Sequence, residues 1–287
     1  MKARIVHSID ELRAAVAARR GAGASVGLVP TMGALHAGHG SLIESSVREN
    51  GCTVVSVFVN PIQFNDAGDY QKYPRTLDGD AELCGDAGAE LVFAPSDADM
   101  YPRPQLSFVN VESVSERLCG AFRPGHFRGV ATVVLKLFNI VLPDVAYFGE
   151  KDAQQLAVIR RMAADLNVPV RIVGVPIVRE PDGLAMSSRN RHLSADERRI
   201  APSLHQALAG LQARIAAGVL DPASLIRDAA SEMEHSGLRV EYLEIVDPDS
   251  IQPVDPIAGP VLAACAVWLG ATRLIDNVTC TPPNTKS

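Results

Sequence analysis

The chain has 287 residues, of which 47% are hydrophobic, and a formal net charge of −6 at pH 7. This length and composition allow one large or two modest domains with a sizeable core, and they argue against disorder. An acidic chain lacks the basic face of a nucleic-acid-binding protein, and no apolar run approaches the roughly 18 residues of a membrane span. The five cysteines are odd in number and scattered, which suits neither a disulfide framework nor a zinc site. We therefore predict a soluble cytoplasmic protein without nucleic-acid or membrane partners.

The first part of the chain alternates predicted strands and helices. Apolar and β-branched runs predict strands at 25–30, 52–59, 90–95, 145–148 and 170–177. Helices are predicted after a capping box at Ser8, after His39, and at 77–87, 129–142 and 152–166. Such alternation is typical of a parallel sheet covered by helices on both faces. We predict an α/β, Rossmann-like, doubly wound domain.

The pattern changes after Val178. A capping box at Ser194–Glu197 predicts a long helix running towards Ala217, and Asp221-Pro222 predicts the start of another. Three strand-like runs follow at 240–246, 261–269 and 273–278. Helices followed by consecutive strands predict a second, smaller α+β domain, so we divide the chain into domains 1–178 and 179–287.

The stretch Pro30–His39, PTMGALHAGH, follows the predicted strand at 25–30 and opens a helix. A helix start after a Gly-rich turn offers unpaired N–H groups and the positive end of the helix dipole to an anion. His36 and His39 would add donors for phosphate oxygens and stabilise charge as pyrophosphate departs. A turn with two surface histidines is the alternative, and the strand–turn–helix context favours the functional interpretation.

Two further strand ends carry polar groups. Asn60 and Gln63 follow the strand at 52–59, where ligands collect in open parallel sheets and amides suit a hydroxyl or carboxylate. Gly149–Asp152 follows the strand at 145–148, with Lys151 placed to meet phosphate and Asp152 to bind a ribose or assist a metal. An Asn-Pro turn and a capped helix with surface charges are the respective alternatives.

Two loops add cationic and hydroxyl groups. Met186–Asn190, MSSRN, has two hydroxyls and a guanidinium beside Gly183, which suits a mobile loop that closes on a triphosphate, although a polar interdomain linker is the alternative. Arg123 could bind an anion, and an equally good interpretation is that it belongs to a structural loop. Each motif is weak alone, and together they are much stronger.

Together these residues resemble the pantothenate synthetase (pantoate–β-alanine ligase) family of the HxGH nucleotidyltransferase superfamily. The match runs from Val29 to Asn277, and its ordered motifs are highly specific. Ile62 stands where the family has threonine, and Arg189 takes the place of a lysine in the KMSKS loop of class I aminoacyl-tRNA synthetases, which the superfamily resembles in fold.

The resemblance implies an amide-forming ligase of pantothenate and coenzyme A biosynthesis. ATP would activate pantoate as pantoyl adenylate with release of pyrophosphate, and β-alanine would then displace AMP. Mg²⁺ would be held mainly by the ATP phosphates rather than by a protein metal site. The resemblance also implies a homodimer through the N-terminal domain, with 1–178 as the catalytic domain that binds ATP and pantoate and 179–287 as a lid.

The resemblance also assigns site residues. It implies catalytic roles for His36, His39, Lys151 and Arg189, with His39 as proton donor. ATP binding is implied for Met32, Gly33, Ala34, Leu35, His36, Ala37, Gly38, His39, Gly149, Glu150, Lys151, Asp152, Val178, Met186, Ser187, Ser188 and Arg189. Pantoate or β-alanine binding is predicted for Gln63, Gln155, Asn60 and Arg123.

Two other functions remain open from the sequence. Another HxGH-type nucleotidyltransferase, acting on a small acid or a phosphorylated alcohol, would keep the histidine site. A non-catalytic nucleotide-binding module would bind ATP without turnover, but it has little need of the two glutamines.

Overall fold

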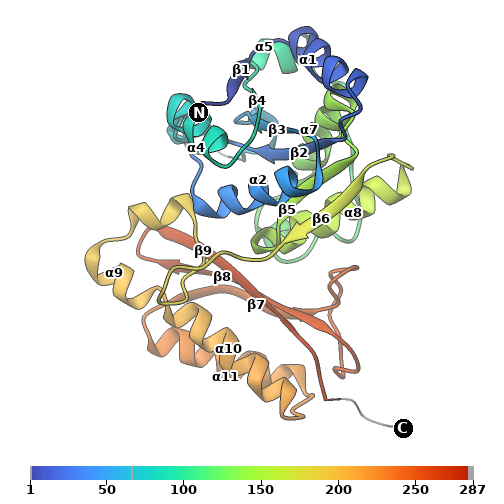
Figure 1. Cartoon of the computed structure of the whole chain (residues 1–287). Coiled ribbons are helices and arrows are strands. Elements are labelled where there is room, and N and C mark those ends of the chain that lie inside the picture. The colour runs from blue at the N-terminus through green and yellow to red at the C-terminus, as the bar shows by residue number, and fades with distance from the viewer. Residues whose placement is uncertain (1, 66, 284–287) are drawn as a thin grey trace. The chain divides into compact units, whose positions relative to one another are not determined.

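Six strands form one wholly parallel sheet in the order β1-β4-β3-β2-β5-β6 (Figure 1). The computed structural model describes residues 2–65 and 67–283. The strands are β1 (Arg4–Val6), β2 (Val26–Thr31), β3 (Cys52–Val57), β4 (Leu91–Phe93), β5 (Val145–Gly149) and β6 (Arg171–Val175). β2 lies in the middle, next to β3 and β5, because the chain builds outward from it in both directions.

Helices cover both faces of this sheet. They are α1 (Ile9–Gly21), α2 (Ala37–Glu49), α4 (Leu77–Asp86), α7 (His126–Val141) and α8 (Ala153–Asp165), with short η1 (Pro61–Gln63), α3 (Ala67–Lys72), α5 (Asp97–Met100) and η2 (Glu150–Asp152). Val29, Val55 and Tyr147 pack against α2 and α4 on one face. Because side chains alternate along a strand, Leu28 and Val54 point to the other face, where α7 and α1 lie. The predicted doubly wound α/β fold is confirmed.

The order of the strands defines where a ligand crevice forms. From β2 the chain adds β3 and β4 on one side, and it later adds β5 and β6 on the other side. In open parallel sheets, such a switch point leaves a crevice outside the carboxyl ends of the central strands. The predicted motifs at Met32 and Asn60 follow the ends of β2 and β3, and the motif at Gly149 begins with the last residue of β5.

A second sheet is antiparallel, in the order β7-β8-β9. Its elements are η3 (Ser188–His192), α9 (Ala195–Ile200), α10 (Ser203–Ala216), α11 (Pro222–His235), β7 (Arg239–Val246), β8 (Val261–Leu269) and β9 (Thr272–Cys280). Leu208, Leu225, Val267 and Leu274 belong to the buried core that the helices form with the sheet. The smaller α+β fold predicted after Val178 is therefore also confirmed.

The chain divides into two compact units that are not simple halves. One comprises Met1–Val111, Arg123–Glu150 and Val158–Pro176. The other comprises Glu112–Phe122, which includes α6 (Cys119–Phe122), Lys151–Ala157 and Ile177–Ser287. The assignment of 1–178 as catalytic domain and 179–287 as lid stays a prediction.

Most predicted elements agree with the structure to within a few residues, but the long helix from Ser194 towards Ala217 is wrong. The capping box at Ser194 forms as predicted, yet α9 ends at Ile200 and α10 begins at Ser203. Pro202 separates them, because a proline has no N–H to donate and its ring clashes with the preceding helical turn. In the described part of the chain, no helix is long and apolar enough to cross a membrane.

Candidate active site

The turn after β2 is held by the side chain of Asp80, from α4, and by that of Thr31, the last residue of β2. Gly33 and Ala34 both have positive φ, at 83° and 52°, which directs the N–H groups of Ala34 and Leu35 towards α4. Both N–H groups donate to the Asp80 carboxylate, at 3.1 and 2.8 Å, and this side chain is almost fully buried. The Thr31 hydroxyl accepts from the Gly33 N–H and donates to a carbonyl of β3. The turn is therefore fixed before any ligand binds.

The two histidines form the cap of α2. The Gly38 N–H donates to Nδ1 of His36 at 3.1 Å, and the His36 N–H donates to Nδ1 of His39 at 3.3 Å. The ring centroids lie 4.2 Å apart. Because both Nδ1 atoms accept hydrogen bonds, each neutral ring carries its proton on Nε2. The backbone thus selects the tautomer in which both imidazoles are Nε2–H donors.

A chain of hydrogen bonds fixes the amide of Gln63. The Asn60 amide nitrogen donates to the Gly129 carbonyl at 3.2 Å and to Oε1 of Gln63 at 2.9 Å, while its oxygen accepts from Tyr101 at 2.6 Å. A carbonyl only accepts, so the Asn60 amide has one allowed orientation and imposes one on Gln63. Gln63 therefore presents its NH₂ group, which contacts Sδ of Met32 at 3.1 Å.

Asn60 itself is 1% exposed and uses both ends of its amide within the protein. The geometry therefore favours a supporting position for Asn60 rather than direct contact with a ligand. A Cβ added to Gly129 would lie 2.5 Å from the Ile62 carbonyl oxygen, so only glycine lets α7 approach η1 this closely.

Arg123 lies beside the same turn through His126. Nδ1 of the buried His126 donates to the Gln63 carbonyl at 2.9 Å, which leaves Nε2 of the neutral ring to accept from the Arg123 guanidinium at 3.4 Å. A cavity of about 150 Å³ adjoins these groups, and its lining includes Gln63, Phe64, Asn65, His126, Arg128 and Gly129. This volume suits a small polar molecule or a few waters, at roughly 30 Å³ per water.

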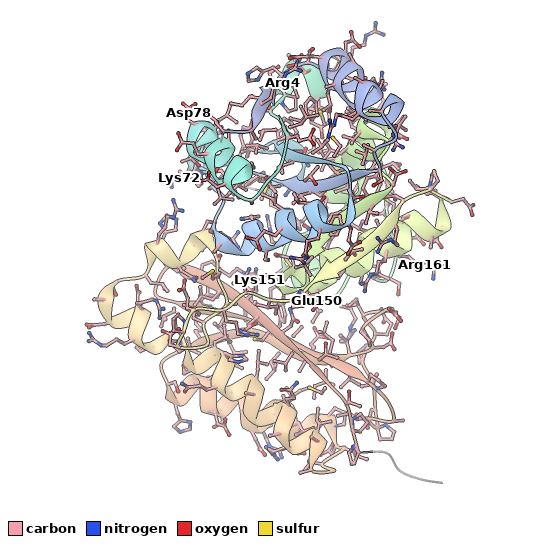
Figure 2. All side chains as sticks on the ribbon, viewed as in Figure 1. Arg4, Lys72, Asp78, Glu150, Lys151 and Arg161 are labelled. Atoms are coloured by element: carbon pink, nitrogen blue, oxygen red, sulfur yellow. The ribbon has the colours of Figure 1, made fainter. Side chains whose placement is uncertain are left out.

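Glu150 and Lys151 follow β5 directly (Figure 2). Glu150 belongs to the first compact unit, and Lys151, Asp152 and Gln155 belong to the second. The Lys151 carbonyl accepts a hydrogen bond from the Asn277 side chain at 3.0 Å. Gln155 is partly exposed at the start of α8.

The neighbouring Gln154 has a structural position. Its amide nitrogen donates to the carbonyls of Val114 and Arg117, at 3.0 and 2.7 Å. This buried side chain therefore attaches the 112–122 segment to α8, in contrast to the partly exposed Gln155.

The segment from Val178 to Arg189 is a small hairpin followed by η3. Arg179 pairs with Ala185, and the Met186 N–H donates to the Val178 carbonyl at 2.9 Å. The Ser187 hydroxyl oxygen accepts from the Arg189 N–H, so its hydrogen is directed elsewhere. The main chain of Met186–Arg189 is thus set by local hydrogen bonds, with the Arg189 side chain exposed.

The structure brings together the predicted residues of each unit separately. In the first unit, Met32, Asn60 and Gln63 are connected by direct contacts. In the second unit, Lys151 and the 178–189 hairpin are connected through β9. Four residues that hold these groups have no signal in the sequence, because their partners are distant along the chain: Asp80, Tyr101, His126 and Asn277.

The arrangement of potential ligands in the described residues limits how a metal ion could bind. Within residues 2–65 and 67–283, no group of three or more His, Cys, Asp or Glu side chains is arranged to hold a metal ion. Mg²⁺ commonly keeps several waters and binds through one or two carboxylates plus substrate phosphates. The exposed carboxylates of Glu150 and Asp152 suit that mode.

The chain is a doubly wound α/β protein with a histidine-capped helix start at its topological switch point, where such folds commonly bind ligands. The family model for pantoate-beta-alanine ligase matches residues 4–279. The chain therefore belongs to the pantoate–β-alanine ligase family, whose members are ligases that form an amide bond.

Individual relatives agree with this assignment. The pantothenate synthetase of Moorella thermoacetica is 51% identical over 275 residues, covering 96% of this chain and 97% of the relative. That of Heliobacterium modesticaldum is 52% identical over 276 residues, with 96% and 98% covered.

Solved structures of this family have the same fold. The pantothenate synthetase of Thermus thermophilus has a TM-score of 0.89 at 45% identity, covering 96% of this chain and 98% of that chain. A pantoate-beta-alanine ligase of Francisella tularensis, complexed with beta-gamma ATP and beta-alanine, has a TM-score of 0.80 at 33% identity, covering 96% and 97%.

Proposed function

We propose that this protein condenses pantoate with β-alanine at the expense of ATP. The carboxylate of pantoate attacks the α-phosphorus of ATP, giving pantoyl adenylate and pyrophosphate. The amine of β-alanine then attacks the acyl carbon, the amide forms, and AMP leaves. The observation that carries this proposal is the family match over residues 4–279.

The helix start of α2 supplies the electrostatic part of this chemistry. Met32–His39 would line the ATP site, with the positive end of the α2 dipole near the phosphates. The N–H groups of Gly33, Ala34 and Leu35 would shape the turn through Thr31 and Asp80. The Nε2–H groups of His36 and His39 would donate hydrogen bonds to phosphate oxygens as negative charge moves onto pyrophosphate. The donor role predicted for His39 would be this hydrogen bond from Nε2–H. Catalysis needs no covalent nucleophile on the protein, because both nucleophiles are substrates.

The acid and the amine would be recognised by amide and guanidinium groups. The NH₂ group of Gln63, fixed by Asn60, suits a pantoate oxygen, and Gln63 is among the residues that line the cavity. Gln155 would hold pantoate from α8, and Arg123 would add positive charge near the Gln63 turn. Asn60 would act through Gln63.

The remaining predicted residues would serve ATP. Lys151 would stabilise charge on the phosphates, while Gly149–Asp152 and the backbone of Val178 would contact the nucleotide. Since the Val178 carbonyl already accepts from the Met186 N–H, an adenine donor would use its second lone pair. The Ser187 and Ser188 hydroxyls and the Arg189 guanidinium would close over the triphosphate.

Three properties of the assembled enzyme belong to the same proposal. Mg²⁺ would bind together with ATP and neutralise phosphate charge. The exposed carboxylate of Asp152 is the type of protein ligand that Mg²⁺ uses beside substrate phosphates. The protein would act in the cytoplasm, where ATP is available and its five free thiols stay reduced. It would be a homodimer through its N-terminal unit.

The test is a product analysis with ATP, Mg²⁺, pantoate and β-alanine. The proposal predicts equal amounts of AMP, pyrophosphate and pantothenate, with no AMP when either pantoate or β-alanine is left out over many turnovers. Formation of ADP and phosphate would refute it. A stable dinucleotide product that forms without any amine would instead support another HxGH-type nucleotidyltransferase.

A further inference from the structure

Two consecutive residues of β9 connect the 178–189 hairpin with Lys151. Side chains alternate between the two faces of a strand, so Asp276 and Asn277 point in opposite directions. Asp276 lies on the face of Leu274 and Val278, which packs against the helices of the second unit. Asn277 lies on the other face, where its amide nitrogen donates to the Lys151 carbonyl at 3.0 Å.

Asp276 holds the base of the hairpin through a two-pronged ion pair. Nη1 and Nη2 of Arg179 donate to its two carboxylate oxygens at 2.7 and 3.0 Å, and the Asp276 side chain is 1% exposed. The same guanidinium donates to the carbonyls of Gly183, at the tip of the hairpin, and of Asn277, at 3.1 and 3.4 Å. One arginine therefore ties the turn of the hairpin to β9.

The two anchors are also connected to each other. The Asn277 N–H donates to Oδ1 of Asp276 at 2.8 Å, so the carboxylate that receives Arg179 also fixes the strand at Asn277. A buried ion pair adds little net stability over apolar residues of the same volume, because desolvation offsets the Coulomb attraction. What a bidentate Arg–carboxylate pair adds is a defined geometry.

We propose that Asp276 and Asn277 are positioning residues for adenylation. They fix the Lys151 backbone and the hairpin that leads to Arg189 to the same strand, β9, and so hold the two relative to each other. This inference rests on the proposed function, in which Lys151 and Arg189 act on the triphosphate. Neither Asp276 nor Asn277 touches substrate. Their loss therefore acts only through the groups that they hold, and only in the half-reaction that uses the triphosphate.

The test separates the two half-reactions in Asn277→Ala and Asp276→Asn variants. Pantoate-dependent ATP–pyrophosphate exchange should fall about 100-fold, the effect of a displacement of about 1 Å in a reacting group. The reaction of supplied, chemically prepared pantoyl adenylate with β-alanine should keep its parental rate. If Asp276→Asn fails to fold, Asn277→Ala decides, because it removes a neutral side chain and leaves the Arg179–Asp276 ion pair in place.

Glu241→Gln is the matched control. It breaks another largely buried Arg–carboxylate pair of the same sheet, with Arg273, which precedes Asn277 by four residues on β9. Both half-reactions should stay at the parental rate in this variant. In a Lys151→Ala background, Asn277→Ala should cause no further loss, because its effect passes through Lys151.

An equal loss in both half-reactions, unchanged exchange, or full additivity with Lys151→Ala would each overturn the positioning role. Absence of exchange in the parental protein would refute the proposed function instead, so the two failures are distinguishable.

Discussion

The imidazoles at the start of α2 are oriented by the backbone that they cap. Because Nδ1 of His36 and of His39 each accept an N–H, a proton added to either Nδ1 would break the cap. The neutral, Nε2-protonated form is therefore the one that the fold supports. In the proposed reaction this form donates a hydrogen bond to phosphate at neutral pH.

Replacing His39 by asparagine separates the cap from the chemistry. The asparagine Oδ1 occupies the place of Nδ1 and keeps the bond from the His36 N–H, but nothing replaces Nε2. We expect an unchanged melting temperature and a 10²- to 10³-fold loss of pantoate-dependent ATP–pyrophosphate exchange, about the cost of one donor to developing charge. His235→Asn, at the exposed end of α11, should change neither quantity. Near-parental exchange in His39→Asn would rule out the donor role.

The sequence predicted that Asn60 and Gln63 lie at a strand end and offer amide groups. It did not predict that Asn60 orients the Gln63 side chain. An Asn-Pro turn after a β-branched strand predicts polar groups at a strand end, and both residues lie there. That Asn60 supports Gln63 depends on Tyr101, His126 and Gly129, which lie about 40 to 70 residues away along the chain. Local patterns carry no information on such contacts.

At the scale of elements, α4 holds the turn that opens α2. Asp80 accepts hydrogen bonds from the N–H groups of Ala34 and Leu35, which are 46 and 45 residues away along the chain. The sequence therefore predicts the helix at 77–87 but not that it supports this turn. The longer strands are also predictable, because they are apolar runs that the sheet buries on both faces. Periodicity does not identify β1, whose three residues are too few to show a period.

Gly33→Ala tests this support of the phosphate-binding turn. The new Cβ would lie 3.0 Å from the Asp80 carboxylate and from Val57, at a φ of +83° that costs a non-glycine residue about 1–2 kcal/mol. We expect lower stability and a KM for ATP raised about tenfold, the equivalent of about 1.4 kcal/mol.

Gly79→Ala is the control for that substitution. Gly79 adjoins Asp80 in α4, has open space at its Cβ and should gain about 1 kcal/mol of stability with an unchanged KM for ATP. An unchanged KM for ATP in Gly33→Ala would show that the turn does not shape the nucleotide site.

At the scale of the whole molecule, the strand order explains why distant motifs belong to one function. β2, β3 and β5 are adjacent, so polar residues that follow them gather at one edge of the sheet. The sequence predicts this because alternating strands and helices allow few parallel topologies. The break between α9 and α10 follows from Pro202, a local signal that the prediction of one long helix overlooked. The assignment of 112–122 to the second unit depends on packing, which composition does not reveal.

His205 makes stability depend on pH. Burial lowers the pKa of its imidazole below the ordinary value of 6.5, and nearby Arg179 lowers it further, while Asp276 opposes the shift. As the pH falls through about 6.5, the unfolded chain binds a proton that the folded chain does not. His205 therefore contributes stability that is present above this pH and is lost as the pH falls towards the folded-state pKa.

Urea unfolding of the parent and of His205→Gln between pH 8 and 5 isolates this effect. The free energy of unfolding of the parent should fall more steeply below about pH 6.5, by at most about 1.4 kcal/mol per pH unit for one proton. Parallel curves for the two proteins would exclude His205 as the source.

In the proposed reaction, the pantoate carboxylate attacks the α-phosphorus of ATP. Pantoate labelled with ¹⁸O in its carboxylate tests this directly, with the products analysed by mass spectrometry after reaction with ATP and β-alanine. AMP should carry one labelled oxygen and the pantothenate amide should keep the other, because the oxygen that bonds to phosphorus leaves with AMP. Unlabelled AMP, or label in inorganic phosphate, would contradict this mechanism.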